Sequence, residues 1–270
     1  MIIEYWISSI SEYLDCIKSN TIDWNKEANI RPWFRGHSNY EYRLIPSILR
    51  DGNENKEFEI TREFRLRSPG YIETPDRDRI DQWLFLMQHY EVPTRLLDWT
   101  ESPLFSLYFA ARKAERKRIE IEKDATVFVL DPYSLNQNYN IGGFPNTWAQ
   151  SSSTLQTIKF AFGTQNDPVN GTKIDYLEDP VAIHPLCVDQ RIKAQKSCFT
   201  LHGNDKRDIV KIFEEKYLIK EKKLFKISIH KEDIQNIYRE LDELGITESV
   251  LFPSLDGLSK ELKYRYDIVY

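Results

Sequence analysis

Strand and helix patterns follow one another along this chain without the regular strand–helix alternation that builds a parallel sheet. Apolar residues at helical spacing predict helices over residues 8–19, 55–68, 77–90, 104–117, 231–244 and 256–264. Short apolar or aromatic runs predict strands over residues 32–36, 125–130, 181–185, 199–202 and 224–229. This order predicts an α+β fold with a mixed, largely antiparallel sheet flanked by helices.

Other segments carry boundary signals or weaker patterns. Ser102 before Pro103 predicts a helix N-cap, and Gly245 predicts a C-cap. Residues 91–99 contain a proline, so we expect a loop or short strand there. Residues 249–255 predict a short strand and turn. Residues 136–171 are rich in Asn, Gly and Ser, and long segments of this kind are often functional.

The length and composition fit a folded domain. The chain has 270 residues, of which 41% are hydrophobic and 29% are charged, and this balance argues against disorder. We expect a single domain over residues 1–270, with a helix-rich half over 1–120 and a strand-rich half over 121–270.

Charge and cysteine content narrow the expected partners. A net charge of −5 does not favour a broad nucleic-acid footprint, which needs a basic surface. Cys16, Cys187 and Cys198 lack metal-ligand spacing, so no metal is expected. The beginning of the chain carries Glu4 and Glu12 within its apolar stretch, and no run of about 18 apolar residues occurs. We therefore expect a cytoplasmic protein with no membrane partner.

Arg35 stands in the sequence Trp-Phe-Arg-Gly-His over residues 33–37. Alternation along a strand turns Phe34 to one face and Arg35 to the other. The planar guanidinium suits phosphate or carboxylate, and Gly36 permits close approach of the backbone to a ligand. The alternative is a structural ion pair between Arg35 and an acidic side chain.

A second polar constellation spans residues 88–100 and combines amide, imidazole, hydroxyl, guanidinium, carboxylate and indole groups. Arg95 and Asp98 lie three residues apart, so they are candidates for an ion pair of the scaffold or for a catalytic pair. His89 is a candidate general base, or a structural histidine bonded to a carbonyl.

Two later segments are less specific. Residues 191–203 begin with polar side chains, including Gln195. A predicted strand and then a glycine follow them. Residues 251–258 contain turn chemistry and are interpreted as fold closure. The sequence has no dinucleotide-binding, P-loop, nucleophile-elbow, zincin or kinase motif, so the folds and activities of those classes are not supported.

These motifs resemble the FRG-domain family, which is named for its Phe-Arg-Gly motif. The resemblance runs from about residue 3 to 262 and rests on residues 33–38, 44–50, 88–110, 191–203 and 241–258. This sequence departs from the family pattern at His37, where Gln is usual, at Glu91, where Gly is usual, and at Ser254, where Asp is usual.

The strand with Arg35 is also similar to the first active strand of the ADP-ribosyltransferase superfamily, where an arginine grips the NAD phosphate. This resemblance implies an NAD-dependent enzyme that binds a small nucleotide and modifies an unidentified macromolecule, in the setting of a bacterial toxin or phage-defence effector. NAD would be its substrate, and its bond to nicotinamide would open through an oxocarbenium-like state. The implied catalytic residues are Arg35, His89 and Gln195. The implied ligand-binding residues are Arg35, Gly36, Tyr90, Thr94, Arg95, Asp98, Thr100 and Tyr108.

Roles within that set differ. Arg35 would bind pyrophosphate, Gln195 would orient the ribose, and Tyr90 or Tyr108 would contact nicotinamide. Thr94 and Thr100 would support the strand. Glu248 is a candidate for the carboxylate that this chemistry uses.

Two other functions remain open at this point. Arg35, Arg95 and His89 could form a pocket that recognises a nucleotide or an anionic partner without turnover. His89 as base with Asp98 as its partner could instead serve a metal-dependent hydrolase acting on nucleotide or nucleic acid.

Overall fold

A computed structural model describes residues 2–24, 31–77, 79–115, 120–137, 178–185, 190–216 and 222–268. Most of the segment 136–171, for which no element was predicted, lies outside these residues. No helix within the described ranges combines the length and apolar character that a membrane crossing requires.

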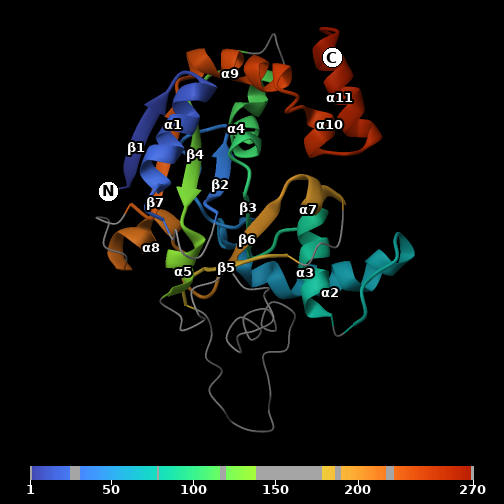
Figure 1. Ribbon diagram of the computed structural model, residues 1–270. Coiled ribbons are helices and arrows are strands. Elements are labelled where there is room, and N and C mark those ends of the chain that lie inside the picture. The colour runs from blue at the N-terminus through green and yellow to red at the C-terminus, as the bar shows by residue number, and fades with distance from the viewer. Residues whose placement is uncertain are drawn as a thin grey trace.

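The described strands form one sheet of seven strands in the order β1-β7-β4-β2-β3-β6-β5 (Figure 1). Their bounds are β1 Ile3–Ile7, β2 Trp33–His37, β3 Leu96–Thr100, β4 Ala125–Leu130, β5 Val181–Ile183, β6 Ser197–Leu201 and β7 Leu224–Ile229. The β1 and β7 strands pair in parallel, and every other pair is antiparallel. The predicted α+β fold with a mixed, largely antiparallel sheet is confirmed.

The helices lie on both faces of this sheet (Figure 1). Their bounds are α1 Ile10–Thr21, α2 Glu57–Arg67, α3 Ile80–His89, α4 Pro103–Ala111, α5 Pro132–Gln137, α7 Gln190–Ala194, α8 Ile209–Lys216, α9 Lys231–Glu243, α10 Glu248–Leu251 and α11 Leu255–Arg265. The β1 strand and the helices α5, α7 and α8 are additions to the predicted elements. The predicted strand and turn over residues 249–255 is wrong, because α10 and the start of α11 occupy that segment.

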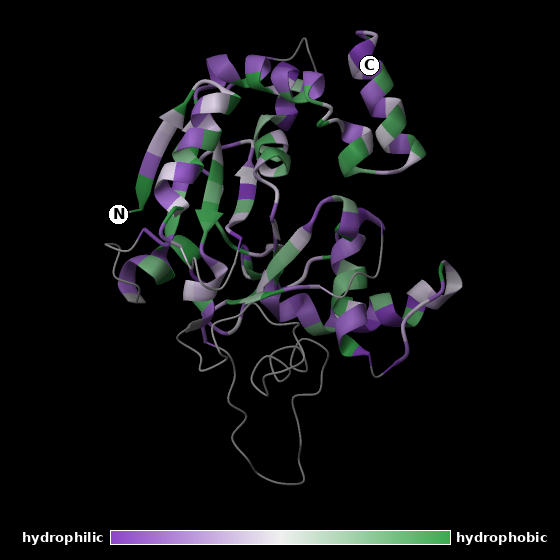
Figure 2. Ribbon diagram, viewed as in Figure 1, coloured by the Kyte–Doolittle hydropathy of each residue, from purple (hydrophilic) through white to green (hydrophobic). Residues whose placement is uncertain are grey.

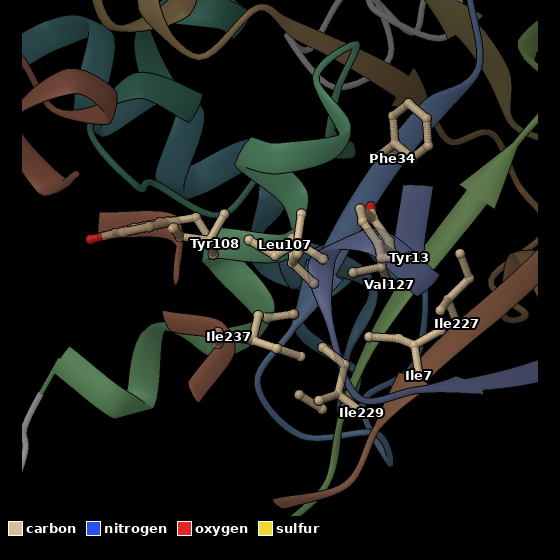
Figure 3. Packing of buried hydrophobic residues seen from close by; sticks show 14 of the residues in the cluster. Ile7, Tyr13, Phe34, Leu107, Tyr108, Val127, Ile227, Ile229 and Ile237 are labelled. Atoms are coloured by element: carbon tan, nitrogen blue, oxygen red, sulfur yellow. The ribbon is translucent and has the colours of Figure 1, made fainter. Parts of the chain in front are cut away.

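The main core fills the space between α1, α4, α9 and one face of the sheet (Figure 3). Val127 of β4, Ile227 of β7 and Leu107 of α4 are buried within it. The β4 strand is apolar except for Thr126, and Figure 2 shows its largely hydrophobic colour. All of its residues are buried. A second cluster packs α3 against β3, β5 and β6, and a third packs α5 and α8 on the opposite face. These packed layers fix the positions of β2 and β3.

Local signals set the ends of α4 and α9. The Ser102 hydroxyl accepts a hydrogen bond from the Phe105 amide at 3.4 Å, and Pro103 begins α4, so the predicted N-cap is confirmed. Gly245 follows α9 with φ of 77°, and its amide bonds the Asp242 carbonyl, which confirms the predicted C-cap.

Candidate functional site

The β2 and β3 strands are in register through a single pair, Phe34 with Thr100, and part beyond it. A cleft of about 1670 Å³ lies where they part. Residues of both strands line it, together with residues of the loop after β2 and of α4 and α11. The parting of two strands exposes backbone and side-chain groups that a continuous ladder would cover, so the cleft is a natural place for a ligand.

Arg35 lies in this cleft with 19% of its side chain exposed, while Phe34 points into the core (Figure 3). The predicted alternation of these two residues is therefore confirmed. Arg35 Nη1 donates to the main-chain oxygen of Asp98 at 2.6 Å and lies 3.6 Å from its carboxylate. The guanidinium thus bonds β3 at a level where the backbones of β2 and β3 no longer pair.

His37 holds the other edge of the guanidinium. Arg35 Nε donates to His37 Nε2 at 2.9 Å, so Nε2 carries no proton and Nδ1 donates to the Tyr42 carbonyl at 3.2 Å. Burial lowers the pKa of His37 well below its usual value, and the charges of Arg35 and Arg50 lower it further. His37 is therefore neutral, and it fixes the orientation of Arg35.

A chain of hydrogen bonds continues from Asp98 to Gln88, which also lines the cleft, and on to Thr94. Gln88 Nε2 donates to Asp98 Oδ1 at 2.9 Å, and the Thr94 hydroxyl donates to Gln88 Oε1. The Leu96 amide donates to the same Thr94 hydroxyl at 3.0 Å. This chain orients the Gln88 amide, and Gln88 in turn positions the Asp98 carboxylate, of which 57% is exposed.

Arg50 is another positive group on the wall of the cleft. Its Nε donates to the Ile45 carbonyl at 2.9 Å, which anchors the exposed side chain to its own loop. Within the described part of the chain, no carboxylate forms an ion pair with Arg50. The charge of Arg50 lowers the pKa of Arg35, although burial is the larger cause. The guanidinium groups of Arg35 and Arg50 thus line the same cavity, and sequence reasoning assigned no role to Arg50.

Gly36 has a packing role that was not expected. A Cβ atom at this position would lie 1.9 Å from the Ser106 carbonyl oxygen and 2.7 Å from the Ala110 amide. Helix α4 therefore crosses β2 at a distance that only glycine permits. Gly36 also lines the cleft, but the backbone it approaches closely is that of α4 and not a ligand.

The expected pairing of Arg95 with Asp98 is wrong. Arg95 Nε lies 2.8 Å from both carboxylate oxygens of Glu57, and Nη1 donates to the Gly203 carbonyl at 2.6 Å. Both side chains of the Arg95–Glu57 pair are buried. Arg95 does not line the cleft, so it belongs to the scaffold that joins α2 to the end of β6.

Thr100 and Gln195 do reach the cleft. The Thr100 hydroxyl donates to the Gln195 carbonyl at 2.7 Å, and Gln195 Nε2 donates to the Leu251 carbonyl at 3.1 Å. These bonds tie β3, the end of α7 and α10 together. The Gln195 amide is therefore occupied by backbone and supports the rim of the cleft.

Several other expected site residues lie elsewhere. His89, Tyr90, Thr94 and Tyr108 are not among the residues that line the cleft. The Tyr108 hydroxyl is buried and donates to Glu248 Oε2 at 2.6 Å. Burial is the main cause that raises the pKa of Tyr108, and the neighbouring Tyr238 raises it further. Tyr108 and Glu248 thus attach α10 to α4, and neither lines the cleft.

A different place brings possible metal ligands together. Asp124, His230 and Glu232 have ligand atoms within 4.8 Å of one another among the described residues. His230 and Glu232 are exposed, and Asp124 already accepts the Lys231 amide at 2.9 Å. This group lies outside the cleft, and it adds nothing to the chemistry of Arg35.

The fold and site define an α+β protein with an arginine-centred cleft at the parting of two antiparallel strands. Residues 31–118, which are part of the chain, match the family model of the FRG domain. This span holds β2, β3 and α4 together with Arg35, Arg50 and Asp98, and it ends before β4. A search of curated proteins and a search of solved structures found no match.

Proposed function

We propose that the cleft binds a nucleotide through its phosphate groups. The observation that supports this most directly is the placement of Arg35 and Arg50 around one cavity, with His37 neutral between Arg35 and the following loop. An anion placed between the two guanidinium groups would relieve their mutual repulsion. A protonated histidine would instead be a third positive charge and could not accept the hydrogen bond that orients Arg35.

The geometry of Arg35 suits this role. Its Nε and Nη1 atoms are held by His37 and Asp98, so the planar fork is fixed before a ligand arrives. Within the described residues, no hydrogen bond engages Nη2. Preorganised guanidinium donors bind phosphate oxygens with little loss of side-chain entropy.

A second function, cleavage of NAD, is favoured by Asp98. Its carboxylate is more than half exposed in the cleft, is held by Gln88, and lies next to Arg35. With the pyrophosphate at Arg35, such a carboxylate would stabilise the positive charge that develops on the ribose as nicotinamide leaves with the bonding electrons. Transfer to an acceptor or to water would complete the reaction. ADP-ribosyl transfer therefore stays a proposal for this cleft.

The hydrolase alternative has less support. It needs His89 beside Asp98 as a base, but the Asp98 carboxylate contacts Gln88 and Arg35, and His89 does not line the cleft. We therefore do not carry it further.

Calorimetric titration of the whole protein with ADP, NAD and inorganic pyrophosphate tests binding, and nicotinamide release tests cleavage. We expect Arg50→Ala to weaken binding of all three by about tenfold, the size of one charge-assisted hydrogen bond. The matched control is Arg67→Ala, an exposed arginine of α2 that pairs with Glu63 away from the cleft, and it should leave affinity unchanged.

The outcomes separate the two functions. Binding without nicotinamide release supports a recognition site, and binding with release supports NAD cleavage. If none of the three ligands binds the wild-type protein, the proposed nucleotide site is wrong.

A further inference from the structure

Tyr42 is the aromatic side chain that the cleft exposes most. Five aromatic rings line it within the described residues, namely Phe34, Tyr42, Trp99, Phe109 and Tyr264. Phe34 and Trp99 are buried, Phe109 and Tyr264 are partly buried, and 54% of Tyr42 is exposed. A large ring that remains open on the wall of a polar cleft can accept a flat ligand without rearranging the core.

The backbone of Tyr42 is fixed relative to the arginine. Arg35 Nε donates to His37 Nε2, and His37 Nδ1 donates to the Tyr42 carbonyl. The ring of Tyr42 also meets the His37 ring edge-on, with centroids 6.0 Å apart and planes at 70°. The imidazole of His37 therefore contacts both the Arg35 guanidinium and Tyr42.

The surroundings of the ring suit a neutral aromatic ligand attached to an anion. Arg43, the next residue, also lines the cleft, and Arg50 lies on the same wall. An arginine in a binding groove adds a cation–π contact to a bound base, and stacking on tyrosine tolerates any base because every base has a π-face.

We propose that the base of the bound nucleotide stacks on Tyr42 while its phosphates contact Arg35 and Arg50. This inference rests on the proposed nucleotide site and adds the residue that distinguishes a nucleotide from a free phosphate or pyrophosphate. The cleft then selects its ligand by two separate contacts. The arginines bind the phosphate groups, and Tyr42 binds the base.

The test compares ADP with inorganic pyrophosphate, which carries the anion and no base, by calorimetric titration of the whole protein. Tyr42→Ala is expected to weaken ADP by roughly tenfold or more, which is the typical loss of one stacking contact, and to leave pyrophosphate unchanged. Tyr42→Phe keeps the ring and should keep the ADP affinity. Tyr40→Ala is the matched control, since Tyr40 lies two residues away with 40% exposure and does not line the cleft.

Each remaining outcome has one meaning. If Tyr42→Ala weakens ADP and pyrophosphate equally, Tyr42 supports the loop and not the base, and the inference is wrong. If both ligands bind and neither responds to Tyr42→Ala, the inference is also wrong while the phosphate site stands. If the wild-type protein binds neither ligand, the proposed function fails and the inference fails with it.

Discussion

Arg95 and Asp98 lie three residues apart on one segment and serve different parts of the molecule. Arg95 forms a buried ion pair with Glu57 of α2, whereas Asp98 faces the cleft beside Arg35. Strand β3 begins between them, at Leu96. Arg95 therefore precedes the strand and pairs with α2, whereas Asp98 lies within the strand and pairs with Arg35. Within three residues, this segment contributes one side chain to the buried contact with α2 and another to the cleft.

The buried pair leads to a stability prediction. Glu57→Gln leaves the Arg95 charge without its carboxylate in a dry environment, and we expect it to lower the free energy of unfolding by about 3–5 kcal/mol. Glu63→Gln is the control, because the Glu63–Arg67 pair of the same helix is exposed and should contribute under about 0.5 kcal/mol. Urea unfolding of both variants measures the difference. Equal midpoints would show that the buried pair contributes no more than a surface pair.

Glu91 offers a stabilising change. It follows α3 with φ of 59°, a left-handed conformation, and its amide bonds the Gln88 carbonyl at 3.1 Å. Glycine adopts this conformation without the steric cost that other residues carry. We expect Glu91→Gly to raise the free energy of unfolding by roughly 0.5–1 kcal/mol. Glu91→Ala removes the same carboxylate and keeps the strain, so a gain in that variant as well would assign the effect to charge.

Asp98 distinguishes binding from catalysis. Asp98→Asn removes a negative charge next to the proposed phosphate site and keeps an oxygen for the bond from Gln88. We expect pyrophosphate to bind about two- to fivefold more tightly, in line with an exposed charge interaction of up to about 1 kcal/mol. Any NAD cleavage should be lost. Asp256→Asn, an exposed change on α11 outside the cleft, should alter neither quantity.

The buried His37 and His202 and the partly buried His184 make stability depend on pH. Burial, as the first cause, lowers the pKa of His37 and His184, and brings that of His202 to about 3. The unfolded chain takes up protons as the pH drops through about 6.5, whereas the folded protein does not, so the folded state loses stability in that direction.

The expected size follows from His202. Between roughly pH 7.5 and pH 5.5, this residue alone should lower the free energy of unfolding by about 1 kcal/mol. Urea midpoints at the two pH values measure the total, and His202→Gln should reduce the difference. A midpoint that does not move between these pH values would contradict the prediction.

Local signals made much of the fold predictable. The strands β4 and β7 are mostly apolar, and their predicted bounds agree with the structure. The β1 strand was missed because it is a short edge strand with Glu4 and Trp6 exposed, and it pairs with β7 from the far end of the chain. The segment at Phe252-Pro253 was misassigned because its turn residues follow one short helical turn, α10, that packs through Leu251.

The site was predictable only in part. Arg35 and Asp98 stand in unusual local sequences, and both reach the cleft. Arg50 and Tyr42 come from irregular segments, and their positions depend on the Ile45 carbonyl and on His37. The hydrophobic periodicity of the sequence gives no information about such tertiary contacts. His89, Tyr90 and Arg95 belong to the same polar segment as Asp98, but chain proximity did not decide which of them would face the cleft.

The contact between Gly36 and α4 decides how mutations of the Phe-Arg-Gly motif should be interpreted. The glycine has no space for a single carbon atom on the side of Ser106, so replacing it would push a core helix off the sheet. An inactive Gly36 variant would therefore report misfolding, even though its neighbour Arg35 lies in the cleft. Loss of function on replacing Gly36 and loss of function on replacing Arg35 would therefore have different causes. Of these two neighbours, Arg35 is the one whose replacement tests the ligand site directly.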